Sequence, residues 1–450
     1  MHVKNLVVFA SAVAVAAASA GAGPNHGGSQ ESIKNLRDKI KNVVIMVMEN
    51  RSFDNLMGGQ KIPGLENPIQ TGPYCNPLNI SQPGQGTGCT AALDFDSIID
   101  DPDHSISGNN LEFYGSFAPD NEAIKSGALK PNMDGFLTEQ IRVYGDKETE
   151  ETLKKQVINY YTEDQVPVIT SLSQNFMVFN HWHSDIPGPT NPNRVALCSG
   201  TSAGKGQNNF QYNSMEQMSI FQQVSELGME WKDYLVDESI QDARWFKWTY
   251  ESNNTDRVVY MDSFYEDAKN GKLPQLAYIN PSCCGVGTNS MHPQGRVSDG
   301  EKLIKDVYEA LRASPQWNET MWIITFDETG GFHDHVMPPS APRPDDLTHT
   351  ETTPSGQDYT FNFDRLGGRM PTWLVSPWTT AGVEQQGVNK CGKTVSYRAT
   401  SILRTLGYLW GFAPYNRRVA TAPSFDHLIG TRFRDTPSSF PEAIPFRYQY

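Results

Sequence analysis

Two apolar runs that lie far apart in the chain end in the same way, on a pair of oxygen-bearing side chains. The first, VVIMVMEN, ends on Glu49 and Asn50, and the second, MWIITFDE, ends on Asp327 and Glu328. Short apolar, β-rich runs of this kind predict buried strands. Because ligands bind beyond the carboxyl ends of strands in open α/β sheets, the four side chains are predicted to converge on one hard cation.

Helical and strand-like patterns alternate along the remaining chain. Helical spacing within 148–180 is followed by the apolar run FMVF, and the strand-like TWLVS at 372–376 is followed by a helical pattern from Thr400. The clearest helix follows His292, where Ser298 and Glu301 fit a capping box. This alternation predicts the α/β class, with a mostly parallel central sheet and helices on both faces.

The N-terminal segment has the pattern of a secretory signal. Lys4 precedes an apolar, Ala-rich run that ends in small residues suited to cleavage after Ala20 or Ala22. Later runs are too short to cross a bilayer, so we expect no transmembrane segment. The predicted organisation is a signal peptide over 1–20, a flexible leader over 21–32, and a single catalytic domain over 33–450 with insertions near 56–127 and 204–275.

Cysteine usage and charge agree with an exported protein that does not bind nucleic acid. An even number of cysteines, six, in an oxidising route predicts disulfides, and we predict a pair between Cys75 and Cys89, at the ends of a Gly/Pro-rich loop. Glycosylation triplets begin at Asn79, Asn253 and Asn318. The net charge of -14 argues against nucleic acid and strongly anionic membrane, so an anionic substrate needs local positive charge.

The segment GPTNPNR supplies a hydroxyl and a guanidinium at a predicted helix start. Thr190 could simply cap that helix, or its hydroxyl could attack phosphorus with backbone N–H groups holding the oxyanion and Arg194 assisting. The spacing does not separate these alternatives. Histidines that could serve such a site are His104, His292, His333 and His335, although the last two alternate and only one could face the site from a strand.

Two other patterns point to different chemistry. Residues 200–204, GTSAG, match the nucleophile elbow of serine esterases, but KGQNNF after them does not predict the required helix. Trp182, Trp245 and Trp248 could form an aromatic cage for choline or could be ordinary core residues.

Four motifs resemble, in order, those of a secreted phosphoesterase family that includes phosphatidylcholine-preferring phospholipases C and a group of acid phosphatases. The motifs are KNVVIMVMENRSFDNLMG, YYTEDQVPVI, SDIPGPTNPNR and TFDETGGFHDHVMPP, and the resemblance covers about 41–412. It implies an alkaline-phosphatase-like α/β fold. The sequence departs from the family pattern at Thr329 and Ala399, where histidines would be expected, and in SCCGVGTNSM before His292.

The resemblance assigns roles position by position. It implies metal ligands at Glu49, Asn50, Asp327 and Glu328, with Thr190 as both ligand and nucleophile, and phosphate-pocket histidines at His104, His292 and His335. The predicted function is a secreted, extracellular or wall-bound phosphoesterase with one divalent cation (Ca, Mg, Mn or Zn), most simply a phospholipase C that forms a phosphothreonine. An acid phosphatase acting on phosphomonoesters and a non-catalytic phosphate- or lipid-binding protein are the alternatives.

Overall fold

The computed structural model of the chain describes residues 26–447. The predicted signal peptide lies outside the described residues. The leader predicted over 21–32 is partly helical, because α1 (Gln30–Lys39) already begins at Gln30. Ahead of that helix, the backbone N–H of Gly28 donates to the carboxylate of Asp426 at 2.9 Å, which attaches this end of the described chain to a distant segment.

An eight-stranded sheet forms the centre of the molecule and confirms the predicted α/β class. Its strands are parallel to their neighbours except for one, β12, which is antiparallel to the strands on both sides. In spatial order the strands are β13 (Gly382–Glu384), β4 (Met177–Phe179), β12 (Trp373–Val375), β9 (Thr320–Phe326), β1 (Asn42–Met48), β8 (Leu276–Asn280), β6 (Trp231–Leu235) and β7 (Val258–Tyr260).

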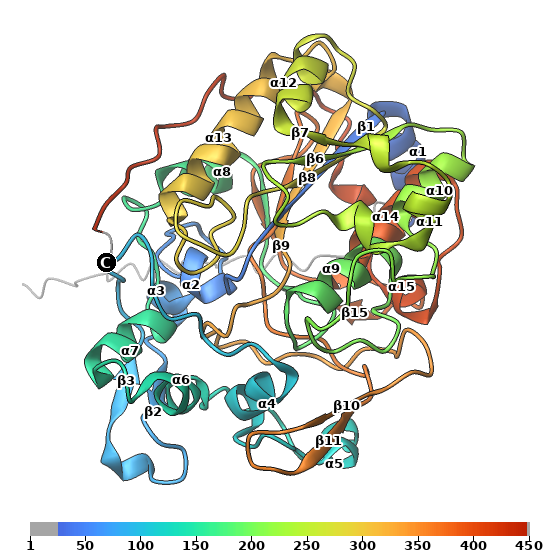
Figure 1. Cartoon of the computed structure of the whole chain (residues 1–450). Coiled ribbons are helices and arrows are strands. Elements are labelled where there is room, and N and C mark those ends of the chain that lie inside the picture. Colours follow the sequence, from blue (N-terminus) through green and yellow to red (C-terminus); the bar gives the residue numbers. More distant parts are fainter. Residues whose placement is uncertain (1–25, 448–450) are drawn as a thin grey trace, which may run out of the picture.

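Helices cover both faces of this sheet (Figure 1). One side carries α8 (Pro167–Asn175), α12 (Met261–Lys269) and α13 (Val297–Ala313), with α13 packed against both of the others. The other side carries α1 with α9 (Thr190–Ser199), α10 (Ile220–Glu226) and α14 (Thr400–Trp410). Because both faces are covered, every residue of β1 and β9 is buried, as the continuous apolar runs predict.

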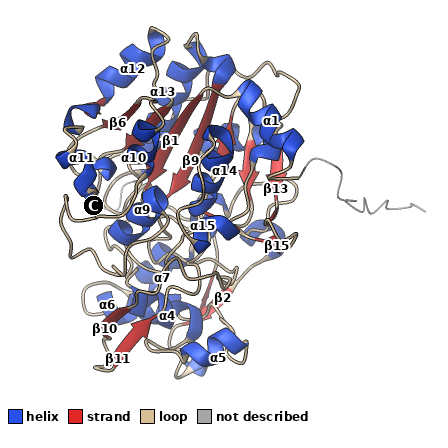
Figure 2. Ribbon diagram, turned by 90° about the vertical axis from the view of Figure 1, so that its right-hand side faces the viewer, coloured by secondary structure: helices blue, strands red, loops and turns tan. Residues whose placement is uncertain are grey.

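A smaller group of elements lies beyond one end of the sheet (Figures 1 and 2). Its own apolar core joins Phe113, Phe136 and Leu137 to neighbouring residues. The predicted disulfide between Cys75 and Cys89 is confirmed and joins two of its strands. The group comprises β2 (Cys75–Pro77), β3 (Thr87–Cys89), α4 (Ile106–Tyr114), α5 (Asn121–Ser126), α6 (Phe136–Tyr144), α7 (Glu150–Ile158), β10 (His349–Thr352) and β11 (Asp358–Phe361).

Short elements complete the described chain. The α-helical ones are α2 (Phe53–Met57), α3 (Pro68–Thr71), α11 (Lys247–Glu251) and α15 (Arg417–Thr421), and single 3₁₀ turns occur elsewhere. The strands are β5 (Trp182–His183), β14 (Gly387–Val388), β15 (Thr394–Val395) and β16 (Tyr397–Arg398). Within residues 26–447, every helix is too short or too polar to span a bilayer.

Two sequence-based predictions about local structure are wrong. The segment 204–275 is not simply an insertion, because it supplies β6 and β7 to the main sheet. The predicted capping box also fails to form, since Arg296 occupies the N-cap of α13. Asp96, from a distant segment, accepts hydrogen bonds from the backbone N–H and hydroxyl of Ser298 at 3.0 and 2.6 Å, and Glu301 instead accepts from the backbone of Ile169 at 2.8 Å.

Candidate active site

The two strand endings predicted to meet do lie side by side. Strands β1 and β9 are neighbours in parallel register, with Met48 opposite Phe326, so the residues that follow them leave the sheet at the same edge. The backbone N–H of Asn50 donates to Oδ1 of Asp327 at 3.2 Å. Glu49, Asn50, Asp327 and Glu328 are all buried.

The side-chain oxygens of three of these residues converge. The amide oxygen of Asn50 lies 3.2 Å from Oε2 of Glu49 and 2.5 Å from Oε1 of Glu328, while its amide nitrogen lies 3.0 Å from Nε2 of His292. Hydrogen bonding alone favours the opposite amide orientation, in which the nitrogen donates to both carboxylates. The orientation with three converging oxygens is the one that suits a cation bound among them.

The electrostatics of this cluster fit a hard divalent cation. Burial raises the pKa of Glu49 to about 7, although Arg194 opposes the shift. Burial, with the charge of Glu49, raises the pKa of Asp327 to about 8, and burial raises the pKa of Glu328 to about 8 despite His104. Oδ2 of Asp327 is buried and has no hydrogen-bond partner among the described residues. These oxygen donors are the type that Ca²⁺, Mg²⁺ and Mn²⁺ prefer.

Arg194 is the buried cation that holds the first of these carboxylates. Its Nε donates to Oε1 of Glu49 at 2.7 Å and lies 3.5 Å from Oδ2 of Asp327. Its terminal nitrogens donate to Asp242 and Asn280, both at 2.9 Å, and to the carbonyl of Val47. The donors of the guanidinium are therefore occupied by partners within the protein. This favours a role for Arg194 in positioning Glu49, rather than the direct assistance to the reaction that was predicted from the sequence.

Thr190 is the first residue of α9 and is nearly buried, with 6% of its surface exposed. Arg194 follows it by one helical turn, so the contact between Arg194 and Glu49 attaches this helix to the end of β1. Pro189 occupies the N-cap position of α9, so Thr190 does not cap this helix, which was one of the two roles predicted for it. Its hydroxyl belongs to the N-terminal turn of a ten-residue helix, where the backbone carries partial positive charge.

Two of the predicted histidines border the carboxylate cluster. Nε2 of His104 lies 3.8 Å from Glu328 and its Nδ1 lies 2.8 Å from the carbonyl of Pro102. Burial alone would lower the pKa of His104, but Glu328 and Asp101 outweigh it and raise the pKa to about 10. His292 lies beside Asn50, and its Nε2 is 3.7 Å from the carboxylate of Asp101.

A cavity of about 650 Å³ opens at this end of the sheet. It is lined by His104 and by Pro189, the residue before Thr190, with Arg142 and Tyr144 from the end of α6 on another side. Volumes of this size are typical of small-molecule sites. Its wall also includes Asp101, Pro102, Asp103, Ser105, Val143, Gln207 and Asn208.

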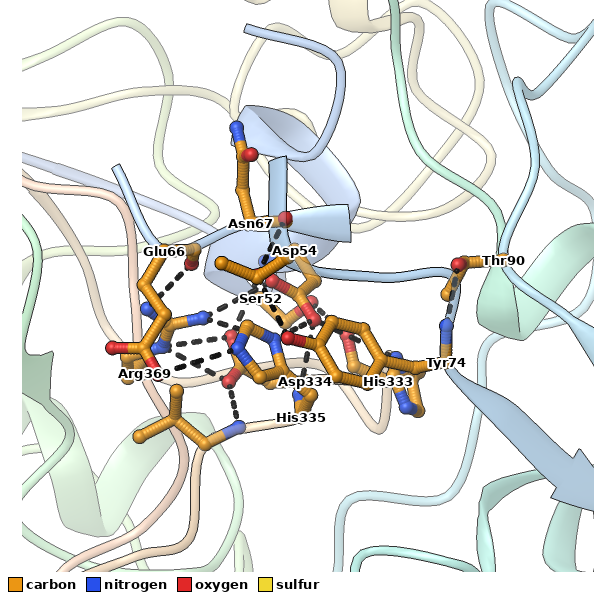
Figure 3. A network of polar contacts seen from close by, with 12 residues as sticks. Ser52, Asp54, Glu66, Asn67, Tyr74, Thr90, His333, Asp334, His335 and Arg369 are labelled. Atoms are coloured by element: carbon orange, nitrogen blue, oxygen red, sulfur yellow. Dashed lines mark hydrogen bonds and ion pairs between the residues drawn. The ribbon is translucent and has the colours of Figure 1, made fainter. Parts of the chain in front are cut away.

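The structure places His335 in a second polar cluster (Figure 3). Its Nδ1 lies 2.7 Å from Oδ2 of Asp54, and its ring stacks on Tyr74 with centroids 3.9 Å apart. Arg369 donates to Asp54 and to Asp334 at 3.0 and 2.9 Å. The contacts of His335 are thus with this cluster, which differs from the phosphate-pocket position that the resemblance implies.

The second cluster suits a structural role better than a metal. Asp54, Asp334 and His335 have ligand atoms close enough for one ion, but the Arg369 guanidinium already neutralises the two carboxylates. Arg369 also donates to the carbonyls of Glu66 and Asn180, so it connects four separate segments. His333 lies in the same region, 3.7 Å from Asp54, and burial lowers its pKa to about 3.

The two competing patterns do not form functional sites. Gly200 ends α9 in a left-handed conformation, and the hydroxyl of Ser202 donates to the carbonyl of Lys205 within a turn, so no nucleophile elbow is present in this described segment. Trp182 is buried and stacks on Tyr397. Trp245 packs between Phe210 and Tyr212, and Trp248 packs near Trp231, so the aromatic-cage hypothesis is wrong.

Sequence reasoning missed several residues that support the site. Asn280 ends β8, the strand beside β1, and the rule that identified Glu49 would have identified it as well. Asp101 belongs to the acidic run before His104 and could have been included with it. Asp242 and the Asp54–Arg369 pair carry no comparable signal, because their contacts depend on segments that only the tertiary fold brings together.

Comparison with known proteins supports one family. The model of the Phosphoesterase family matches residues 40–413. The chain is 34% identical over 426 residues to non-specific phospholipase C6 of Arabidopsis thaliana, covering 91% of this chain and 76% of that protein. It is 31% identical to non-specific phospholipase C3 of the same plant, covering 92% and 77%. A non-hemolytic phospholipase C of Burkholderia pseudomallei is 24% identical, covering 77% and 53%.

Similarity to solved structures is more distant. A protein in the alkaline phosphatase superfamily from Vibrio parahaemolyticus aligns with a TM-score of 0.34 and 12% identity, covering 59% of this chain and 66% of that chain. The lipoteichoic acid synthase LtaP of Listeria monocytogenes aligns with a TM-score of 0.35 and 10% identity, covering 59% and 69%.

Proposed function

The chain belongs to the Phosphoesterase family, and from this premise we propose that it is a metal-dependent phospholipase C that acts through a phosphothreonine at Thr190. The observation that carries the proposal is the meeting of two acidic strand endings beside the N-terminus of α9. The names of the plant relatives support a phospholipid substrate. The cavity next to Pro189 is large enough for a phosphate and a headgroup.

Glu49, Asn50, Asp327 and Glu328 are the residues that would hold the cation. When bound, a divalent cation lowers the pKa of a neighbouring hydroxyl and neutralises charge that develops on the phosphate. Arg194 keeps Glu49 in place, and the backbone N–H of Asn50 keeps Asp327 in place. This arrangement lets an acidic protein of net charge -14 accept an anionic phosphoester.

Thr190 supplies the nucleophile in this proposal. Its hydroxyl gives its proton to solvent and its oxygen attacks phosphorus, while the bond between phosphorus and the diacylglycerol oxygen breaks. The positive end of the α9 dipole favours the negative phosphate at this position, whereas the backbone N–H of Asn191 already donates to Asn208 at 2.8 Å and Pro192 has none. Water then attacks the phosphothreonine, which releases the phosphorylated headgroup and restores the hydroxyl of Thr190.

His104 and His292 have different roles in the proposed reaction. Glu328 and Asp101 raise the pKa of His104 to about 10, which favours a positively charged ring near the phosphate. His292 lies beside Asn50 and Asp101, and we assign to it the proton that the leaving diacylglycerol oxygen takes up. In the second step the attacking water gives a proton to His292, which restores its acid form, and the departing Thr190 oxygen takes up a proton from solvent.

We also propose that the protein is exported. The apolar N-terminal run has the pattern of a signal peptide, and Cys75 and Cys89 form the disulfide expected of an oxidising route. Attachment of glycans at Asn253 and Asn318, both exposed, would agree with this proposal. N-terminal sequencing of protein recovered from the medium, with cleavage after residue 20 or 22, is the direct measurement.

The central experiment compares Thr190→Ala, Thr190→Ser and the control Thr152→Ala on phosphatidylcholine vesicles, with diacylglycerol as the measured product. Thr190→Ala should reduce kcat by at least about 10³-fold, which corresponds to roughly 4 kcal/mol of barrier. Thr190→Ser should retain a measurable part of the activity, and acid-quenched wild type should carry phosphate on Thr190. A Thr190→Ala variant within threefold of wild type would refute the nucleophile.

A second assay separates the two hydrolytic functions. The same cation site and hydroxyl can act on a phosphomonoester, so the acid-phosphatase alternative uses the same residues. Turnover is therefore measured on phosphatidylcholine and on an aryl phosphate monoester. Higher kcat/KM on the lipid supports the phospholipase C, higher kcat/KM on the monoester supports the phosphatase, and binding of either without turnover supports a non-catalytic protein.

A further inference from the structure

Two adjacent cysteines lie next to the predicted metal ligand Glu49. Cys283 and Cys284 form a disulfide with each other. A sulfur from each of them, a ring nitrogen of His292 and a carboxylate oxygen of Glu49 all lie within 4.8 Å of one another. This group combines two sulfurs, one nitrogen and one oxygen, in contrast to the oxygen donors of the neighbouring cation site.

The loop that carries the sulfurs is held firmly against β1. The backbone N–H of Cys283 donates to Oγ of Ser239 at 2.9 Å, and Ser282 and Asn289 bond to each other across the loop at 2.9 Å. The backbone N–H of Glu49 donates to the carbonyl of Ser290, also at 2.9 Å. The position of the sulfurs beside Glu49 therefore follows from the loop's own bonds and not only from the disulfide.

Exposure makes the pair chemically accessible. Cys283 is buried, but Cys284 is exposed, so a reductant can approach one sulfur from solvent. A dithiol would attack that sulfur, form a mixed disulfide, and leave as a cyclic disulfide, releasing both cysteines as thiols. In this exchange the dithiol is oxidised and the protein pair is reduced, so two electrons and two protons are transferred.

We propose that the reduced Cys283–Cys284 pair, together with His292 and Glu49, forms a redox-gated site for a thiophilic divalent cation such as Zn²⁺ or Cd²⁺. Sulfur, nitrogen and oxygen donors in this ratio are typical of four-coordinate Zn²⁺ sites, with bonds of about 2.0–2.3 Å. Binding displaces the two thiol protons. Bonds of this length place the donor atoms of a tetrahedral site roughly 3.3–3.8 Å apart. The two sulfurs, which are bonded to each other in the disulfide, therefore separate after reduction, and the more distant donors approach by up to about 1 Å.

This site has a consequence for the proposed phospholipase. Glu49 is also a ligand of the proposed phosphoester cation site, and His292 is the proposed proton donor there, so a thiophilic cation at the cysteines withdraws both residues from the phosphoester reaction. The reduced, loaded protein should therefore be inactive, and reoxidation after removal of the cation should restore activity. This inhibitory part rests on the proposed function, whereas binding at the cysteines does not.

The test measures cadmium binding by the full chain without substrate. Protein is reduced with a dithiol, freed of reductant without oxygen, and titrated with Cd²⁺ while the ultraviolet thiolate-to-cadmium absorption is recorded. The reduced wild type should show a saturating two-thiolate signal that oxidised protein lacks. Cys283→Ser/Cys284→Ser should lose that signal, and His292→Gln should weaken Cd²⁺ binding by at least about tenfold.

Matched controls identify the source of the signal. Reduction also opens Cys75–Cys89 and leaves the exposed Cys391 as a thiol, so Cys75→Ser/Cys89→Ser and Cys391→Ser are titrated in parallel. Both controls should keep the two-thiolate signal. Equal signals from reduced wild type and from Cys283→Ser/Cys284→Ser overturn the proposal, as does loss of the signal in the Cys75→Ser/Cys89→Ser control.

A second measurement tests the proposal even if the Cys283→Ser/Cys284→Ser variant misfolds. Wild type alkylated at Cys284 after brief reduction keeps its folded chain but should also lose the two-thiolate signal, and an unchanged signal overturns the proposal. Because absorption is recorded without lipid, a positive cadmium result with an inactive enzyme means that only the proposed function has failed.

Discussion

Arg194 shows how one buried residue can organise a site without contacting a substrate. It carries the charge that offsets Glu49 and Asp242, and removing one partner of a buried ion pair typically costs about 3–5 kcal/mol. Lysine can replace the charge but cannot supply the forked set of donors. The geometry of Glu49 therefore depends on guanidinium shape as well as on charge.

Arg194→Lys should lower kcat by about 10- to 100-fold, a range typical of residues that orient metal ligands. It should also weaken cation binding, which a calorimetric titration measures directly. Arg417→Lys, at an exposed ion pair with Asp346, is the control and should leave both quantities unchanged. Normal cation affinity in Arg194→Lys would contradict the positioning role.

The two histidines near Asn50 should respond differently to the leaving group. Loss of a general acid slows departure of a poor leaving group most, so His292→Gln should reduce turnover of the lipid by about 10²-fold or more. On a substrate with a good phenolate leaving group the same variant should lose much less. His104→Gln should reduce both rates by a similar factor, because a fixed charge acts on the phosphate itself. Equal sensitivity of the two variants would show that the roles are assigned incorrectly.

The sequence was informative about residues that directly follow strands and less so about their supports. Glu49, Asn50, Asp327 and Glu328 lie together because β1 and β9 are adjacent, a placement that apolar runs and the strand-end rule predict. His335 lies in a different cluster because Asp54, on α2, bonds its ring. A motif gives the order of residues along the chain, but such partners depend on side-chain directions in the folded state.

At the scale of elements, α13 illustrates a local rule replaced by a tertiary contact. Ser298 and Glu301 have capping-box spacing, yet Asp96 accepts from the backbone N–H of the buried Ser298 at the start of the helix, and Glu301 accepts from α8. Asp96→Ala should therefore lower the free energy of unfolding by about 1–2 kcal/mol, as for loss of an N-terminal cap. Asp94→Ala, a nearby and more exposed change, should cost less than about 0.5 kcal/mol in the same denaturant titration.

Glu301 gives a pH-dependent prediction for the same helix. Burial raises its pKa to about 8 from an ordinary value of 4.5, so the folded protein holds a proton that the unfolded chain releases. Its contribution to stability is full below pH 4.5 and is lost as the pH rises towards 8. Glu301→Gln keeps an acceptor for Ile169 but does not ionise. It should be more stable than wild type at pH 8 by roughly 1–3 kcal/mol and similar at pH 5, as measured by denaturant unfolding.

Strand β6 was missed for a related physical reason. Its sequence, WKDYL, contains Lys232 and Asp233 and does not read as a core strand. Asp233 is nevertheless buried, because Asn280 and the backbone of Ala243 donate to its carboxylate at 2.6 and 2.9 Å. A hydrophobicity pattern counts such a residue as polar and therefore as exposed, although hydrogen bonds within the fold satisfy its carboxylate.

At the scale of the whole molecule, the candidate active site depends on segments from distant parts of the chain. Glu49 and Asp327 lie far apart in the sequence. In the second cluster, Arg369 connects the segments that follow β1 and β9 to Glu66 and Asn180. A mostly parallel sheet with helices on both faces requires strands and helices to alternate along the chain, so this alternation in the sequence predicted the α/β class. The smaller group of elements lies beyond the strand ends (Figure 2) and supplies Arg142 and Tyr144 to the wall of the cavity.

Because this site joins so many segments, cation binding should stabilise the entire fold. A cation at 100 times its Kd adds about 2.7 kcal/mol. With an unfolding entropy of about 2.1 cal/mol/K per residue, a chain of 450 residues should gain roughly 3 °C in Tm. Glu49→Gln should lose this gain, and a matched exposed change, Glu150→Gln, should keep it.

The gain should also depend on pH in a defined direction. The pKa values of Glu49, Asp327 and Glu328 are raised to about 7–8, so in cation-free protein their ionisation lowers stability as the pH rises from about 4 to 8. A cation binds the ionised carboxylates and offsets that loss. Thermal unfolding with and without Ca²⁺, Mg²⁺, Mn²⁺ or Zn²⁺ should therefore show a larger Tm difference at pH 8 than at pH 5. The same difference at both pH values, or one that persists in Glu49→Gln, would mean that the cation binds elsewhere and that these buried acids hold protons in the working protein.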